Sequence, residues 1–280
     1  MRFDRSRFTA TAKATGFQAD SLEKVLRLRE LLNEFQKHSF LRGKLVLKGG
    51  TALNLFYLGL KRLSVDIDLN YIGQVDREAM LAERPDIIKA VEQIATGLGY
   101  KLRNGIDDHA LREWYLGYFN HAGAQDQLQA EINFLMRACA LAPRTLPAAS
   151  LLDSQPCEFP VLATEEVFGG KIKAMIDRRH ARDLYDLFRF ANSDLKYDPE
   201  ILRKLPSSSA APWTMTSGRT RWSAHPTWTQ NKSTPCCIRC SRTASRRGPS
   251  RKGIRFFCAA TLRRNQQKFK SKAENLLSRK

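Results

Sequence analysis

The sequence lacks the features that mark membrane-spanning, secreted and disulfide-stabilised proteins. No run of apolar residues approaches the ~18 consecutive residues that a membrane-spanning helix needs. The first fifteen residues mix Arg, Asp and Thr without an apolar stretch, so they do not have the pattern of a secretory signal. Cysteine is scarce, with six in 280 residues. These absences predict a cytoplasmic protein with no membrane partner, in which disulfides are not expected.

The final quarter of the chain lacks acidic residues. Residues 206–280, here called the tail, contain 17 of the 47 Lys and Arg residues but a single acid, Glu274. The formal net charge of +19 therefore arises mainly in the tail, whereas residues 1–205 are nearly balanced. The tail also contains three of the four Trp residues and four of the six Cys residues. The net charge consequently says little about the rest of the chain.

Three interpretations of the tail remain open. Cys237, Cys240, Cys258 and His225 are the residue types of a zinc site, but no second paired ligand motif accompanies them. Many Arg residues among three Trp residues also fit a basic RNA-binding extension. We favour a third hypothesis, out-of-frame translation from about residue 206 onward, because the composition changes abruptly there to Arg, Ser, Thr, Pro, Trp and Cys. This hypothesis predicts a disordered tail without a selected fold.

Between residues 21 and 60 the pattern predicts a helix, a strand and a second helix around a glycine turn. A strand over 45–47 meets Gly49, Gly50 and Thr51 directly before the second helical stripe. Glycines remove Cβ atoms where the backbone must approach another group, and Thr51 can cap the exposed amides. The start of such a helix suits a phosphate, because its first N–H groups are free and its dipole is positive there. A tight turn with an N-cap is the alternative.

Residues 65–71 alternate apolar and polar side chains and therefore predict a strand. Asp66 and Asp68 share its polar face, with Cβ atoms roughly 6–7 Å apart. Two carboxylates at this spacing repel each other unless a cation lies between them. Mg²⁺ takes hard oxygen ligands and leaves coordination positions for phosphates. A solvated strand face is the alternative, but the preceding glycine turn favours a site for one or two Mg²⁺ ions.

A second alternating segment, 128–134, places Glu131 on its polar face. If this strand lies beside the first, Glu131 completes a cluster of three carboxylates. Such a cluster can hold two metal ions, one to activate an attacking hydroxyl and one to neutralise a departing pyrophosphate. Taken alone, Glu131 is equally compatible with an ordinary polar strand face.

These motifs together resemble a known family. The Gly49-Gly50-Thr51 turn, a helix and Asp66-Ile67-Asp68 resemble the polymerase-β-like nucleotidyltransferase superfamily. Within it, the chain is most similar over about residues 20–200 to the AbiEii/AbiGii toxin family of type IV toxin–antitoxin (abortive-infection) systems. The resemblance implies transfer of a nucleotide from an NTP to an acceptor hydroxyl at a tRNA 3′ end. It also implies growth arrest as the outcome and a cognate antitoxin as a partner.

The resemblance extends to Lys171, Arg178 and the run Arg182-Asp183-Leu184-Tyr185-Asp186. Lys171 and Arg178 share one face of a predicted helix, and two cations on one face are expected to meet an anion. The resemblance implies that Lys171 approaches the nucleotide phosphates, with Arg178 as a second anchor, and that Asp183 is needed for activity. Ordinary helix solvation with an Arg182–Asp186 pair is the alternative.

The sequence as a whole predicts an α/β (α+β) fold, a polymerase-β-like mixed sheet with flanking helices followed by a helical region. The predicted segments are an N-terminal stretch, the nucleotidyltransferase core, the start of a helical domain and the tail: 1–20, 21–160, 161–205 and 206–280. The predicted catalytic residues are Asp66, Asp68, Glu131, Lys171 and Asp183, and the predicted nucleotide-binding residues are Gly49, Gly50, Thr51, Lys171 and Arg178.

Two other functions remain open at this point. One is an enzyme on the same scaffold that moves a phosphate or a nucleotide onto a protein. The other is an inactive homologue with a damaged C-terminal part that only binds NTP, RNA or antitoxin. Neither the preferred NTP nor the acceptor can be identified from the residues, because base choice depends on a few pocket contacts.

Overall fold

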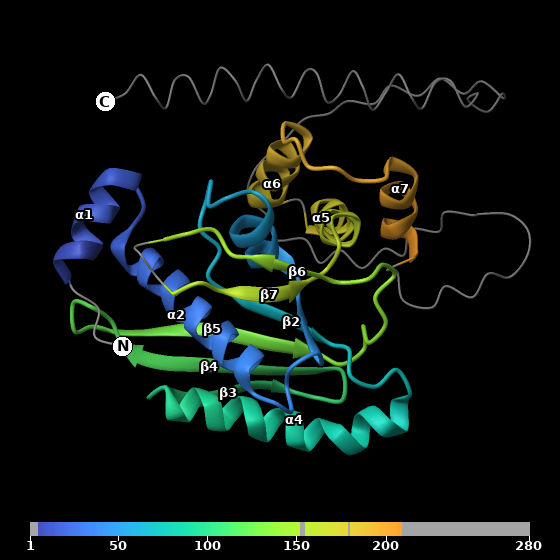
Figure 1. The fold of residues 1–280 in the computed structure, drawn as a ribbon, viewed down its shortest axis with the longest axis horizontal. Coiled ribbons are helices and arrows are strands. Elements are labelled where there is room, and N and C mark those ends of the chain that lie inside the picture. The colour runs from blue at the N-terminus through green and yellow to red at the C-terminus, as the bar shows by residue number, and fades with distance from the viewer. Residues whose placement is uncertain (1–4, 152–154, 179, 209–280) are drawn as a thin grey trace, which may run out of the picture. The chain divides into compact units, whose positions relative to one another are not determined.

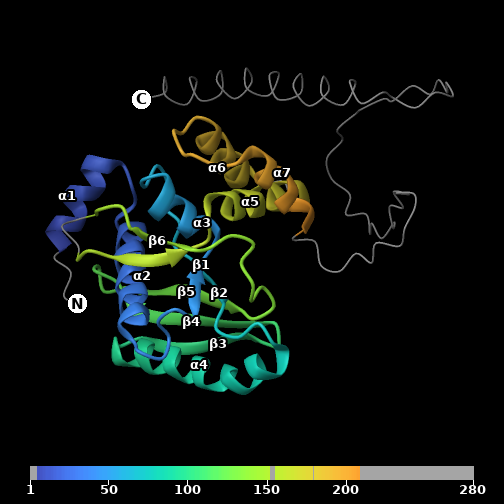
Figure 2. The same ribbon diagram turned by 45° about the vertical axis from the view of Figure 1, so that its right-hand side comes forward.

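The structure of the chain is a computed structural model that describes residues 5–151, 155–178 and 180–208. The tail lies outside the described residues from 209 onward, and with it the three interpretations given above. The described residues form one seven-stranded mixed sheet with flanking helices, which confirms the predicted fold class (Figures 1 and 2).

The sheet has the strand order β3-β4-β5-β2-β1-β7-β6. The β2–β5 and β1–β7 pairs are parallel, and the other neighbours are antiparallel. The strands are β1 (Leu45–Leu47), β2 (Ile67–Tyr71), β3 (Lys101–Asp107), β4 (Leu111–Phe119), β5 (Gln125–Asn133), β6 (Arg144–Pro147) and β7 (Glu158–Val161).

Helices surround this sheet (Figures 1 and 2). The helices are α1 (Arg5–Thr15), α2 (Ala19–Lys37), α3 (Gly49–Thr51), η1 (Ala52–Tyr57), α4 (Arg77–Gly97), α5 (Thr164–Arg178), α6 (Ala181–Ala191) and α7 (Pro199–Ser208). None of the helices within the described ranges is long and apolar enough to cross a membrane.

The two-residue period of the strands separates a core face from a polar face. On β2, Ile67, Leu69 and Tyr71 are buried in the hydrophobic core. This face packs against α4, because the Tyr71 hydroxyl donates to Glu83 and the Trp114 indole N–H donates to Glu92 at 2.8 Å. The even-numbered side chains of β2, including Asp68, therefore project from the opposite face.

The parallel pairing of β2 with β5 aligns Asp68 with Glu131. The prediction for Glu131 requires that its strand lie beside the strand of Asp68, and the structure confirms that it does. Parallel neighbours need a crossover connection, which is supplied here by α4 and the β3–β4 hairpin.

Two predicted elements differ from the structure. The predicted strand at 65–71 begins only at Ile67, so Asp66 lies in the preceding loop. The helix after the glycine turn continues as the π-helix η1, in which the Leu58 amide donates to the Leu53 carbonyl five residues earlier. Turns of this kind occur frequently at functional sites, because they displace the backbone locally.

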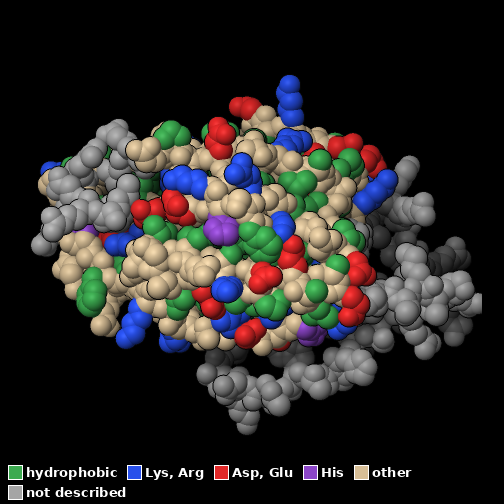
Figure 3. Space-filling model, turned by 60° about the horizontal axis from the view of Figure 1, so that its bottom comes forward, with side chains coloured by type: hydrophobic (Ala, Val, Ile, Leu, Met, Phe, Trp, Pro, Cys, Tyr) green, Lys and Arg blue, Asp and Glu red, His purple; other side chains and the backbone are tan. Residues whose placement is uncertain are grey.

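The helices α5, α6 and α7 follow β7, with α6 and α7 both in contact with α5, and aromatic side chains join α5, α6 and the segment before α7. The rings of Phe168 and Phe190 stack at 3.6 Å between centroids, and Tyr197 lies 4.7 Å from Phe190. The predicted segment boundaries near residues 160 and 205 stay predictions. Figure 3 shows acidic, basic and hydrophobic side chains mixed over one face of the molecule, as the near balance of charge in residues 1–205 leads one to expect.

The core gives a direct test of the packing. Replacing Leu47, which has no exposed surface on the central strand β1, by Ala is expected to lower the free energy of unfolding by about 2–5 kcal/mol. Val75→Ala is the control, because Val75 is 65% exposed and its truncation should change stability by less than about 0.5 kcal/mol. Urea unfolding measures both, and equal effects would contradict this placement of the core.

Candidate active site

The turn after β1 brings the chain's backbone against the carboxylate of Asp68. Gly49 has φ +73°, a left-handed conformation that favours glycine. A Cβ atom on Gly49 would lie 2.0 Å from Asp68 Oδ2, so a side chain at this position and the carboxylate cannot occupy the same space. The Lys48 amide donates to the Asp68 carbonyl at 2.8 Å and fixes the register of the two segments. Gly49 is therefore required by a close approach as well as by its backbone angle.

The predicted role of Thr51 as a helix cap is wrong. The Thr51 side chain is buried, and its hydroxyl donates to the Asp66 carbonyl at 2.6 Å. This bond ties the start of the helix to the loop that carries Asp66, the residue directly before β2. Thr51 can still contribute its backbone amide to a ligand, because the first N–H groups of a helix have no intrahelical acceptor.

Asp68 lies in a crowded electrostatic environment. Burial, together with the neighbouring Glu131 and Asp66 carboxylates, raises the pKa of the Asp68 carboxyl to about 6 against the opposing charges of Lys48 and Lys171. Lys48 Nζ lies 3.5 Å from Glu131 Oε1, so this cation stands beside the carboxylates. Three acids and two lysines thus share one region.

The carboxylates of Asp66 and Asp68 are chemically suited to bind a hard divalent cation. The space left by the missing Cβ of Gly49 holds the Asp68 carboxylate, whose pKa is raised mainly by burial and then by the neighbouring carboxylates, a cost that a bound cation would offset. Carboxylate oxygens are the ligands that Mg²⁺ prefers. Nevertheless, no three His, Cys, Asp or Glu side chains in the described part of the chain lie close enough together to hold a metal ion, so the predicted cluster of three carboxylates is not formed, although Glu131 is aligned with Asp68. Asp66 and Asp68 remain the predicted metal ligands.

Lys171 of α5 lies inside a buried ionic network. Its ammonium group is 2.8 Å from Asp183 Oδ1 and 3.1 Å from Asp186 Oδ2, and its side chain is 7% exposed. Arg178 binds Asp183 through two hydrogen bonds of 2.7 and 2.9 Å. These bonds from Arg178, together with the bond from Lys171, lower the pKa of Asp183 despite its burial. The structure thus brings Lys171, Arg178 and Asp183 together.

Asp186 pairs with Arg62 and not with Arg182, the partner that the alternative interpretation gave it. The Asp186 carboxylate accepts two hydrogen bonds from Arg62, at 2.7 and 2.6 Å, and is fully buried. Burial would raise the pKa of Asp186, but the hydrogen bond and charge of Arg62, together with Lys171, outweigh it and lower the pKa. Arg62 lies in the loop before Asp66, so this pair connects α6 to that loop.

Sequence reasoning missed Lys48, Arg62, Asn54 and Asp186. Lys48 directly precedes Gly49, and this position was the available signal for it. For Asp186 the sequence offers a partner on its own helix, Arg182, only as an alternative, and no local pattern indicates Arg62. Asn54 is buried on η1 and carries an unpaired Oδ1 atom, which no periodic pattern reveals.

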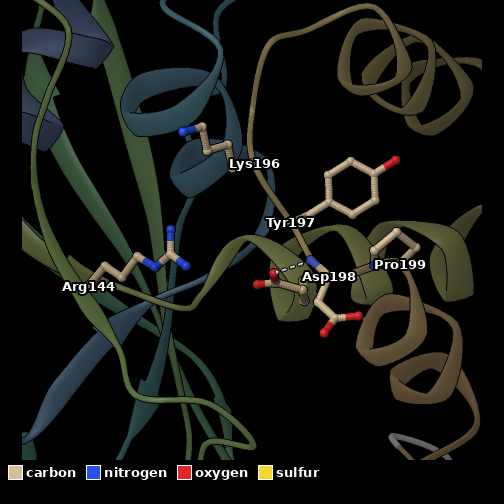
Figure 4. Close-up of a pocket in the computed structure, with 6 residues that line it drawn as sticks. Arg144, Lys196, Tyr197, Asp198 and Pro199 are labelled. Atoms are coloured by element: carbon tan, nitrogen blue, oxygen red, sulfur yellow. Dashed lines mark hydrogen bonds between the residues drawn. The ribbon is translucent and has the colours of Figure 1, made fainter.

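A separate open pocket of about 520 Å³ lies between β6, the start of α5 and the segment before α7 (Figure 4). In it, Glu165 Oε1 accepts a hydrogen bond from the Asp198 amide at 2.8 Å. No predicted site residue lines this pocket; its lining residues are Arg144, Glu165, Lys196, Tyr197, Asp198 and Pro199.

Residues 30–211 match the profile of the family described as nucleotidyl transferase AbiEii toxin, type IV TA system. The chain belongs to the AbiEii family. This match confirms the resemblance stated from the motifs and identifies the protein as a nucleotidyltransferase of a toxin family. A search of curated proteins finds no match.

The chain is similar to several solved structures, and that of MenT4 shows the same fold. The MenT4 nucleotidyltransferase toxin of Mycobacterium tuberculosis matches with a TM-score of 0.52 and 22% identity, over 71% of this chain and 68% of that chain. JHP933 of Helicobacter pylori matches with a TM-score of 0.44 and 18% identity, over 65% and 71%. ANT(2″)-Ia, solved with adenylyl-2″-tobramycin, matches with a TM-score of 0.40 and 15% identity, over 65% and 95%.

The raised pKa of Asp68 predicts a pH-dependent cost to stability. Its carboxyl holds a proton more tightly in the folded than in the unfolded chain, so the wild type loses stability as pH rises from about 4 to about 6. Asp68→Asn removes this loss. Urea unfolding in a chelator should therefore show the variant more stable than the wild type at pH 8 and equal to it at pH 4. A difference that is the same at both pH values would contradict the assignment.

Proposed function

We propose that this AbiEii-family enzyme uses Mg²⁺ to transfer a nucleotide from an NTP to a hydroxyl at the 3′ end of an RNA, with tRNA as the acceptor. The observation that carries the proposal is the alignment of Asp68 with Glu131 beneath the Gly49 turn. A turn rich in free backbone amides suits the triphosphate, and adjacent carboxylates suit the metal-assisted step.

The chain's own residues have separate roles in this reaction. The acceptor oxygen attacks the α-phosphorus, the bond from this phosphorus to the oxygen that bridges it to the β-phosphate breaks, and pyrophosphate leaves. Glu131 orients the acceptor hydroxyl and takes its proton, since its side chain is 25% exposed beside Asp68. The amides of Gly49, Gly50 and Thr51 hold the triphosphate, with Lys171 and Arg178 beyond them.

Asp66 and Asp68 would hold the Mg²⁺, which supplies a Lewis acid for the attacking and leaving oxygens when bound. Lys171 is already paired with two carboxylates, so a phosphate that approaches it must compete with Asp183 and Asp186. Lys171 and Arg178 accordingly provide positive charge near the triphosphate from fixed positions, because Asp183 binds both side chains and sets their direction.

The partner, the biological outcome and the location that we propose are inferred from the family. Membership in a type IV toxin family supports a cognate antitoxin as partner, growth arrest as the outcome and the cytoplasm as the location. MenT4, itself named a nucleotidyltransferase toxin, has the same fold. These features stay proposals for this chain.

The central test replaces Asp68 by Ala. Purified full-length protein is incubated with Mg²⁺, total RNA and each α-labelled NTP in turn. The wild type should label RNA with one NTP, and the variant should lose at least ~100-fold of this rate, because the step depends on charge stabilisation at this carboxylate. Asp86→Ala, at an exposed position on α4, should keep the wild-type rate.

The same assay separates the alternatives. RNase-resistant label would identify a protein acceptor, and transfer from γ-labelled NTP would identify phosphate transfer. Nucleotide binding by the wild type without any incorporation would support the inactive homologue. A variant Asp68→Ala that transfers at the wild-type rate would refute the proposed site.

A further inference from the structure

We propose that Asp186 is a positioning residue that, through Arg62 and Asn54, fixes the Gly49–Thr51 turn in the conformation that binds the nucleotide. This inference rests on the proposed function in one respect, since it takes the triphosphate of an NTP as the ligand of the turn. It assigns no chemistry to Asp186, which touches none of the reacting groups.

Asp186 acts on the turn through two side chains, Arg62 and Asn54, here called its two arms. The first arm is the Arg62–Asp186 pair. Both hydrogen bonds from the Arg62 guanidinium to Asp186 are charge-assisted, and the planar fork matches the carboxylate in a way that a lysine cannot reproduce. Arg62 keeps 23% of its side chain exposed, whereas Asp186 is fully buried. The buried carboxylate thus sets the position of the more exposed arginine.

The second arm is Asn54. Its amide nitrogen donates to the Gly50 carbonyl at 2.9 Å and lies 3.5 Å from Asp186 Oδ1. The same carboxylate therefore orients the side chain that holds the carbonyl of the turn. Asn54 is almost completely buried on η1, which leaves it little freedom to bind elsewhere.

The two arms hold Gly50 between them. A Cβ atom built on Gly50 would lie 2.7 Å from Ser64 Oγ and 3.3 Å from Arg62 Nη2. One side of Gly50 thus faces the arginine held by Asp186, and its carbonyl is bound by the asparagine next to Asp186. Because the turn must present its amides in a fixed direction to bind a phosphate, a shift of either arm changes the site without touching the ligand.

The network also explains how the fold accommodates Asp186 as a buried charge. It receives two bonds from Arg62 and faces Lys171 at 3.1 Å, so its charge is compensated by two cations. Buried ion pairs often add little net stability compared with apolar replacements. Precise placement of the turn is the property that this pair adds.

The test uses Arg62→Lys in the full chain, which keeps the charge and removes the fork. Calorimetric titration with each of the four α,β-methylene NTPs in the presence of Mg²⁺ measures binding without turnover. We expect the dissociation constant of the bound nucleotide to rise at least fivefold, with a matching rise in KM for the corresponding NTP and a smaller change in kcat.

Arg112→Lys is the matched control. Arg112 is 5% exposed, donates to Glu92 at 2.8 Å and lies 2.9 Å from Asp107, but it projects toward α4 on the other face of the sheet. This variant should lose thermal stability, as Arg62→Lys does, yet bind nucleotide within twofold of the wild type. An equal loss of binding in both variants would show general destabilisation and overturn the inference.

Asn54→Ala removes the second arm without changing any charge, and it should also weaken nucleotide binding while Lys171 remains paired. Wild-type affinity in both Arg62→Lys and Asn54→Ala would overturn the positioning role alone. A wild type that binds none of the four nucleotides would instead overturn the proposed function, and the inference with it.

Discussion

The close approach of the Gly49 backbone to the Asp68 carboxylate is the constraint on which the site depends. It requires a glycine at a positive φ, and it places a buried carboxylate beside the start of a helix. The Lys48–Asp68 backbone bond and the β2–β5 register then bring Glu131 alongside. The raised pKa of Asp68 follows from this crowding, since carboxylates held together out of water favour the protonated form.

Cations from distant segments balance this concentration of negative charge. Lys48 stands beside Glu131, while Lys171 and Arg178 reach the region from α5 and are themselves held by α6. The ionic network therefore has two effects. It joins α5 to α6 and, through Arg62, α6 to the loop before β2, and it orients the positive groups that the proposed reaction needs near the phosphates.

Local patterns predicted the parts of this site that depend on neighbouring residues. The alternation around Asp68 and Glu131 gave both strands and their polar faces, and the glycine pair gave the turn. The bond from Thr51 to Asp66 and the π-helix escaped prediction, because they depend on how the loop closes. The Arg62–Asp186 pair joins residues 124 positions apart, so only the packing of α6 against the turn reveals it. The AbiEii resemblance indicated that Asp183 matters, but the partners of Asp183 and Asp186 came from the geometry.

The most direct test of the account is a crystal structure of the full-length protein with Mg²⁺ and the α,β-methylene NTP that it binds best. We predict a triphosphate on the amides of Gly49, Gly50 and Thr51, with a metal ion between it and the carboxylates of Asp66 and Asp68. A nucleotide bound instead in the pocket formed by Arg144, Lys196 and Tyr197, with no metal at the aspartates, would contradict the account.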